Sequence, residues 1–248
     1  MFKCHNLVLP KSNIKVTLVV FVPKNIKKEK MSTIYFFDGQ NTYLDTQATY
    51  GRALRAHKKL NKYNMLGVAI TGYYNEDDRD STYCPFKLYE EHKPEICEAF
   101  IDDIESTIIP FIHSNYNVYD DMDHQLIYGS SLAAITALYI GFKKDLFKYI
   151  AAFSTATFVD ERKLFDLITK NRKDRYVYLY VGDNESSDNK FKPLDFLLGS
   201  NKLYDLLKIN NIPCEFKTKK KGIHNEKYWG KYIKKFYKYY KKTKADGK

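Results

Sequence analysis

The pattern of apolar and polar positions changes period several times along this chain. Short runs rich in Val, Ile, Tyr and Phe, bounded by polar or turn residues, are typical of buried strands. They occupy 15–22, 33–37, 65–71, 125–128, 149–153, 176–181 and 214–218. Between them, apolar residues recur every three or four positions, which predicts helices with one buried face. These helices cover 51–61, 94–114, 131–142, 161–170, 194–210 and 226–242.

Strand and helix alternate strictly in the second half of the chain. Such alternation predicts a mostly parallel central sheet with helices on both faces, which is an α/β fold. No repeat, proline-rich linker or low-complexity block divides the sequence. We therefore expect a single domain over 1–248, with a frayed basic tail at 241–248.

A serine lies at one of the predicted strand-to-helix corners. Apolar residues up to Tyr128 form the strand end, and the helical pattern begins after Ser131. In a nucleophile elbow, G-x-S-x-G, small residues stand two positions either side of the serine, because strand and helix pack tightly beneath it. Here these positions are Gly129 and Ala133. The alanine weakens the bare motif without excluding it.

Length and composition narrow the class of protein. A chain of 248 residues with 44% hydrophobic content has enough apolar residues for a full core. No apolar run reaches the length of a membrane span. The run at 16–22 is short and ends at Pro23, so we interpret it as a strand rather than a signal sequence. Four scattered cysteines fit neither a zinc site nor a disulfide framework, and we expect a reduced, cytoplasmic protein without a metal or cofactor.

The formal net charge is +11, and lysines are dense at 217–221 and 227–248. This excess raises the hypothesis of an anionic partner such as nucleic acid or a membrane surface. However, apolar residues fall at helical spacing between the lysines of the last segment, at Trp229, Ile233, Phe236, Tyr237 and Tyr240. We therefore favour a solvated helix face and expect only weak, salt-sensitive binding to nucleic acid.

Several blocks of the sequence resemble the putative esterase family of α/β-hydrolases, which includes the enterochelin esterases. The segment GSSLAAITALYIGFKKDLFKYIAAFSTATF resembles the family's elbow region, and YFFDGQN at 35–41 resembles its strand followed by D-G-Q-N. The segment at 79–85 resembles R-x-x-x-Y-x-P, VGDNE at 181–185 its acid-bearing turn, and GIHNE at 222–226 its histidine loop. The similarity extends from about 13 to 240. Ala133 and Ala134 depart from it, since the family usually has glycines there.

A serine nucleophile needs a base, and the base needs a carboxylate. His224 is flanked by a glycine after the last predicted strand and before the last helix, which suits the order serine, acid, histidine. The turn after the 176–181 strand offers Asp183, Glu185 and Asp188 as the acid. The resemblance implies Glu185. Asp183 stays an alternative, because an aspartate there also suits a turn cap.

The oxyanion of an acyl-transfer reaction needs two backbone N–H donors in this fold. We expect them from Leu132, which follows the serine, and from Gln40, in the loop after the 33–37 strand. Tyr43, Tyr83, Phe86 and Phe191 are candidates for a substrate pocket.

Together these features predict a serine carboxylic-ester hydrolase that acts on a small or soluble ester through an acyl-enzyme. Two alternatives stay open. One is acyl transfer on the same fold, and the other is a catalytically idle scaffold that binds an anionic partner through its lysines.

Overall fold

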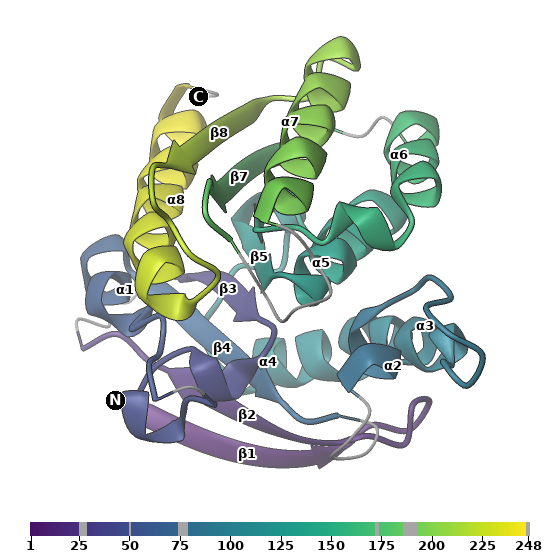
Figure 1. Ribbon diagram of the computed structural model, residues 1–248. Helices are drawn as coiled ribbons and strands as arrows, with labels where there is room; N and C mark the ends of the chain where they lie inside the picture. Colours follow the sequence, from purple (N-terminus) through teal and green to yellow (C-terminus); the bar gives the residue numbers. More distant parts are fainter. Residues whose placement is uncertain (25–28, 50, 74–78, 172–173, 186–192, 247–248) are drawn as a thin grey trace.

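The computed structural model describes residues 1–24, 29–49, 51–73, 79–171, 174–185 and 193–246. Its centre is an eight-stranded sheet in the order β1-β2-β4-β3-β5-β6-β7-β8 (Figure 1). The strands are β1 (Phe2–Val8), β2 (Lys15–Phe21), β3 (Ser32–Phe36), β4 (Met65–Thr71), β5 (Gln125–Ser130), β6 (Tyr149–Phe153), β7 (Tyr176–Gly182) and β8 (Cys214–Lys219). β1 pairs antiparallel with β2, and β2 pairs antiparallel with β4. The pairs from β4 to β8 are all parallel, which confirms the mostly parallel sheet.

Helices cover both faces of this sheet, as predicted (Figure 1). On one face lie α1 (His57–Tyr63) and α8 (Glu226–Asp246). The other apolar cluster contains residues of α3 (Pro94–Asp103), α4 (Ile109–Asn115), α5 (Leu132–Lys143), α6 (Glu161–Lys170) and α7 (Pro193–Ile209). Alternation along β3 supplies both clusters, because Tyr35 packs on the α5 side while Ile34 and Phe36 pack on the α8 side. The fold is therefore the expected α/β architecture with a core on each side of the sheet.

Two elements near the amino terminus differ from the prediction. β1 is an edge strand with mostly exposed side chains, so it lacks the apolar alternation that would reveal it. The helix predicted from 51 begins only at His57, because Gly51 (φ 67°) and Arg55 (φ 52°) have left-handed backbone conformations. The residues before α1 therefore form a loop.

The helix predicted at 94–114 is a succession of three helical segments. α3 is followed by a π-helical turn at Ile104–Ile108 and then by α4. Pro110 near the start of α4 has no N–H to donate to the preceding turn, which explains the interruption. A short helix, α2 (Arg79–Tyr83), lies in a segment that the periodicity did not assign.

The last helix extends to Asp246, through most of the segment predicted to fray. Tyr240 is fully buried and anchors this end. The Thr243 hydroxyl donates to the Tyr239 carbonyl at 3.0 Å, and the Lys244 ammonium donates to the Tyr240 hydroxyl at 3.2 Å. Across the described ranges, no helix combines the length and the apolar character that crossing a membrane requires.

Candidate active site

Ser131 occupies the sharp turn between β5 and α5. Its backbone angles, φ 58° and ψ −123°, are rarely adopted by a residue with a side chain and cost about 1–3 kcal/mol. The Ser131 N–H donates to the Phe153 carbonyl at 2.9 Å, and its own carbonyl accepts from the Ala134 N–H at 3.2 Å. These bonds hold the strained turn. Ser131 lines a cleft of about 340 Å³ at the carboxyl ends of the parallel strands.

The two small residues around this turn, Gly129 and Ala133, differ in whether the structure has room for a methyl group. A methyl group on Gly129 would lie 2.1 Å from the Ala133 carbonyl oxygen, a distance that real Cβ atoms do not show. The glycine at this position is therefore required by the close approach of strand and helix. Ala133 is itself fully buried, and its methyl group is accommodated. The alanine in place of the motif's second glycine is therefore compatible with the turn.

Glu185 and His224 form a hydrogen-bonded pair across two neighbouring strand ends. The His224 Nδ1 lies 2.8 Å from Glu185 Oε2. Glu185 is fully buried, although it is a carboxylate. Its other oxygen, Oε1, accepts from the Gly182 N–H at 2.6 Å and from the Ser154 hydroxyl at 2.5 Å. A buried carboxylate with three partners is fixed in position and is well suited to orient an imidazole.

Ser154 connects this pair to the elbow and was not identified from the sequence. It receives a hydrogen bond of 2.8 Å from the Trp229 indole N–H while donating to Glu185. Its neighbour Phe153 accepts the Ser131 N–H, so the elbow and the acid are anchored at the same end of β6. The only available signal was its position directly after a predicted parallel strand, where functional residues gather.

Two glycines allow the acid turn and the histidine loop to approach each other. A methyl group on Gly182 would lie 2.3 Å from the Gly222 carbonyl oxygen, and the Asn184 N–H donates to that same oxygen at 3.0 Å. The backbones of the two loops are therefore in direct contact. This contact brings Glu185 within reach of His224.

We expect Gly182→Ala to separate these loops and to destabilise the protein by about 1–3 kcal/mol, as overpacking commonly does. For a chain of this size, each 1 kcal/mol lowers Tm by about 2–4 °C, which thermal unfolding measures. Gly51→Ala is the control, because its methyl group meets nothing within 4 Å and only the left-handed backbone (φ 67°) is strained. A Gly182→Ala variant with the Tm of the wild type would contradict the packing argument.

The predicted oxyanion donors lie at the starts of two helical turns. Leu132 is the first residue of α5, and Gln40 is in the 3₁₀ turn Gly39–Asn41 after β3. First-turn N–H groups have no intrahelical acceptor, so both are suited to bind an anion. Gln40 and Ser131 line the same cleft. The Gln40 side chain instead donates to the Tyr73 hydroxyl.

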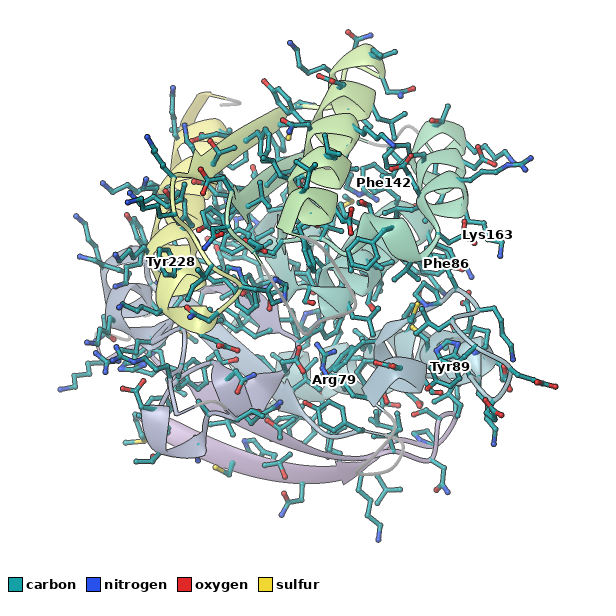
Figure 2. The ribbon with its side chains drawn as sticks, viewed as in Figure 1. Arg79, Phe86, Tyr89, Phe142, Lys163 and Tyr228 are labelled. Atoms are coloured by element: carbon teal, nitrogen blue, oxygen red, sulfur yellow. The ribbon has the colours of Figure 1, made fainter. Side chains whose placement is uncertain are left out.

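A partly buried ion pair supports the loop that carries Gln40. The Arg79 guanidinium donates through Nε and Nη2 to the Asp38 carboxylate, which also accepts from the Tyr73 hydroxyl at 2.9 Å. Burial alone would lower the pKa of Arg79, but the adjacent Asp38 charge raises it overall, so the guanidinium stays charged. Figure 2 shows Arg79 near the middle of the molecule. All three side chains line the cleft, and this grouping of Asp38 with Arg79 was not predicted.

The candidate pocket aromatics do not line this cleft where the structure describes them. Tyr43 is buried in the α8-side core, 6.1 Å from the Phe36 ring. The hydroxyl of the buried Tyr83 accepts the Asp38 N–H at 3.2 Å. Phe86 packs against Tyr139 and lies apart from Arg79 in Figure 2. Large apolar rings gain most from full burial, which explains these positions. Phe191 lies outside the described residues.

Most of the residues that line the cleft are polar. Besides Ser131 and the residues around Asp38, they include Asn41, Thr49, Glu226 and the edge of Trp229. Burial raises the pKa of Glu226 above its usual value. The His224 ring packs against Trp229, with ring centroids 4.8 Å apart. Within the described part of the chain, no hydrogen bond joins the Ser131 hydroxyl to the His224 ring, and such bonds are often long in enzymes without substrate.

The mostly parallel sheet with helices on both faces defines an α/β-hydrolase fold. The crystal structure of the BES protein from Bacillus cereus is similar, with TM-score 0.76 and 18% identity over 96% of this chain and 94% of that chain. S-formylglutathione hydrolase (FrmB) from Staphylococcus aureus has TM-score 0.71 and 15% identity over 97% and 96%. The enterobactin esterase FES from Shigella flexneri has TM-score 0.76 and 14% identity over 98% of this chain and 59% of that one. Residues 10–237 match the model of the family described as "Putative esterase", and the chain belongs to that family.

Proposed function

We propose that this protein is a serine carboxylic-ester hydrolase with Ser131 as nucleophile, His224 as general base and Glu185 as the orienting acid. The observation that supports it most strongly is the hydrogen bond of 2.8 Å between the buried Glu185 carboxylate and the His224 ring. This pair is anchored at the same strand end as the strained turn of Ser131. Family membership and similarity to esterases support ester hydrolysis independently.

The proposed reaction has two halves. In the first, the Ser131 hydroxyl attacks the ester carbonyl while His224 accepts its proton, and His224 then gives that proton to the leaving alcohol as the ester C–O bond breaks. In the second half, water attacks the carbonyl of the acyl-enzyme while His224 accepts the water proton. His224 then gives that proton to the Ser131 oxygen as its bond to the acyl group breaks, and the carboxylic acid is released. Glu185 fixes the imidazole tautomer in both halves and stabilises the imidazolium.

The tetrahedral intermediate carries a negative charge on the former carbonyl oxygen. We assign its stabilisation to the backbone N–H groups of Leu132, which follows Ser131 in the chain, and of Gln40, which lines the same cleft as Ser131; both belong to first helical turns. The Asp38–Arg79 ion pair and the hydrogen bond from the Asp38 N–H to the Tyr83 hydroxyl position the loop before Gln40. The Gln40 donor is then fixed before the substrate binds.

The substrate we propose is a small or soluble ester. The cleft has a volume of only about 340 Å³, and Tyr73 and Trp229 are the aromatic residues among those described in its lining, so it has few apolar contacts to offer a long acyl chain. The names of the similar structures refer to S-formylglutathione in one case and to enterobactin in another, so they do not define one acyl group.

Two measurements test this proposal together. A fluorophosphonate probe is expected to label one serine per chain, and p-nitrophenyl esters of graded chain length are expected to be hydrolysed. The acetate and butyrate esters should have the highest kcat/KM, because the small cleft offers longer chains few additional contacts. Absence of both labelling and hydrolysis in a folded sample would overturn the proposed function. A marked preference for long-chain emulsions would contradict the substrate class alone.

A further inference from the structure

A second hollow lies beside the catalytic cleft. It has a volume of about 180 Å³ and is formed by α1, the loop before it and the first turns of α8. Glu226 belongs to the walls of both the hollow and the cleft. The two helices that border it lie on the same face of the sheet (Figure 1).

The walls of this hollow carry far more positive than negative charge. The carboxylates are those of Asp45 and Glu226. The cationic side chains, contributed by both helices and by the loop, are Arg52, Arg55, Lys58, Lys227, Lys231 and Lys234. Basic residues from segments far apart in the sequence therefore converge on one small volume.

The two carboxylates leave most of this charge unbalanced. Asp45 accepts from Arg55 Nε at 3.2 Å, and this bond holds the pKa of Asp45 well below its usual value. Glu226 is almost fully buried, and burial raises its pKa. Lys231 lies over the Tyr228 ring, 5.6 Å from its centroid. No carboxylate of the described residues forms an ion pair with the other four cations, Arg52, Lys58, Lys227 and Lys234.

The crowding of like charges affects at least one lysine directly. Partial burial lowers the pKa of Lys234, and the charges of Lys58, Lys59 and Arg55 lower it further. A neighbourhood of this kind is unfavourable in the unliganded protein because the cations repel one another. A bound anion would remove this repulsion and would therefore stabilise the folded state.

The backbone segments that carry these cations are held together by close contacts and hydrogen bonds. A methyl group on Gly230 would lie 2.4 Å from the Leu54 carbonyl oxygen, so α8 rests directly on the loop before α1. That loop is held from its other side, since the Leu54 N–H donates to Asn41 at 2.8 Å and the Ala56 N–H donates to Thr42 at 3.1 Å. The cations therefore project from a fixed backbone, which lowers the entropic cost of binding.

We propose that this hollow binds a short chain of phosphate groups, either a free polyphosphate or the polyphosphate portion of a small molecule. Several cations around a small volume match several phosphates in series, and arginine and lysine are the side chains that bind phosphate best. The proposal stands apart from ester hydrolysis, because none of its cations takes part in the chemistry at Ser131.

Isothermal titration calorimetry with sodium tripolyphosphate at constant ionic strength tests this site. We expect one ligand per chain, bound at least tenfold more tightly than orthophosphate, because more cations are engaged at once. The double variant Lys58→Gln/Lys234→Gln should weaken binding by tenfold or more. Thermal unfolding verifies that this variant is folded, and the substituted side chains are at least partly exposed.

The matched control is Lys62→Gln/Lys238→Gln. Both residues lie on the same two helices, are exposed and stand outside the hollow, so the loss of net charge is identical. We expect this control to bind tripolyphosphate like the wild type. Equal weakening in both double variants, no weakening in either, or a stoichiometry well above one would overturn the proposal in favour of diffuse electrostatic attraction.

A further comparison distinguishes the two sources of the ligand. Adenosine triphosphate bound more tightly than tripolyphosphate, with the same sensitivity to Lys58→Gln/Lys234→Gln, would assign the site to the polyphosphate of a nucleotide. Tripolyphosphate bound more tightly would assign it to free polyphosphate. A single-stranded oligonucleotide is the third ligand in this comparison. If it bound more tightly than adenosine triphosphate and tripolyphosphate, and if both double variants weakened its binding equally, the result would contradict the proposed site.

Discussion

Replacement of Ser131 by alanine is expected to lower kcat for p-nitrophenyl acetate by roughly 10⁴-fold or more, as loss of the nucleophile does in serine proteases. The turn should survive, because its bonds to Phe153 and Ala134 involve only the backbone. Alanine also tolerates this backbone conformation about as well as serine does. Thermal unfolding is therefore expected to be nearly unchanged, which separates a catalytic from a structural effect.

Ser130→Ala is the control for this experiment. Ser130 also lines the cleft, but it belongs to β5, where it pairs in register with Phe153 of β6. It does not occupy the strained turn, so most activity and the fluorophosphonate label should remain. Labelling of Ser130, or undiminished labelling of Ser131→Ala, would show that the nucleophile has been assigned to the wrong residue.

Glu185→Gln is expected to reduce kcat by roughly 10³ to 10⁴-fold. An amide neither fixes the imidazole tautomer nor stabilises the imidazolium, and Glu185 Oε2 is the atom that faces His224 Nδ1. The substitution also places an NH₂ group or an uncharged oxygen opposite the Ser154 hydroxyl and the Gly182 N–H, the present donors to Oε1. We therefore expect some loss of stability besides the loss of turnover.

Asp183→Asn is the matched comparison, because it removes a carboxylate two residues away on the same turn. The structure gives Asp183 another role: its Oδ1 accepts the Lys221 N–H at 2.6 Å, and the residue is exposed. Asparagine retains an oxygen for this bond, so turnover should stay within a few-fold of the wild type. A large loss of kcat in Asp183→Asn, together with a nearly unchanged kcat in Glu185→Gln, would assign the role of the acid to Asp183.

Sequence patterns predict an element correctly where its structure depends on residues that are close together in the chain. The strand at 125–130, the small residues around Ser131 and the helix after it follow one another directly in the chain, and each is recognisable from its own residues. All seven strands after β1 begin within one residue of the predicted start, because most of them carry runs of buried apolar residues. The exposed edge strand β1 has no such run, and it was missed for that reason.

Hydrophobic periodicity does not reveal where a local backbone conformation interrupts a helix. The apolar pattern across 94–114 does not reveal the π-helical turn, because Ile104 is followed by both Ile108 and Ile109, and spacings of four and five residues together suit an α-helical and a π-helical turn. The helix predicted from 51 likewise starts earlier than α1, which begins at His57. Ala53 and Leu54 are buried like helix residues but lie in a loop with a left-handed Arg55.

By itself, the sequence determined the α/β alternation, the elbow at Ser131 and the positions of Glu185 and His224 at successive strand ends. Only the tertiary structure decided which groups meet there. The partners of Glu185 Oε1, the ion pair of Asp38 with Arg79, and the burial of Tyr43, Tyr83 and Phe86 away from the cleft all depend on it. The physical reason is that hydrophobic periodicity reports which face of an element is buried, whereas partners distant in the chain are selected by packing and hydrogen bonding after the elements assemble.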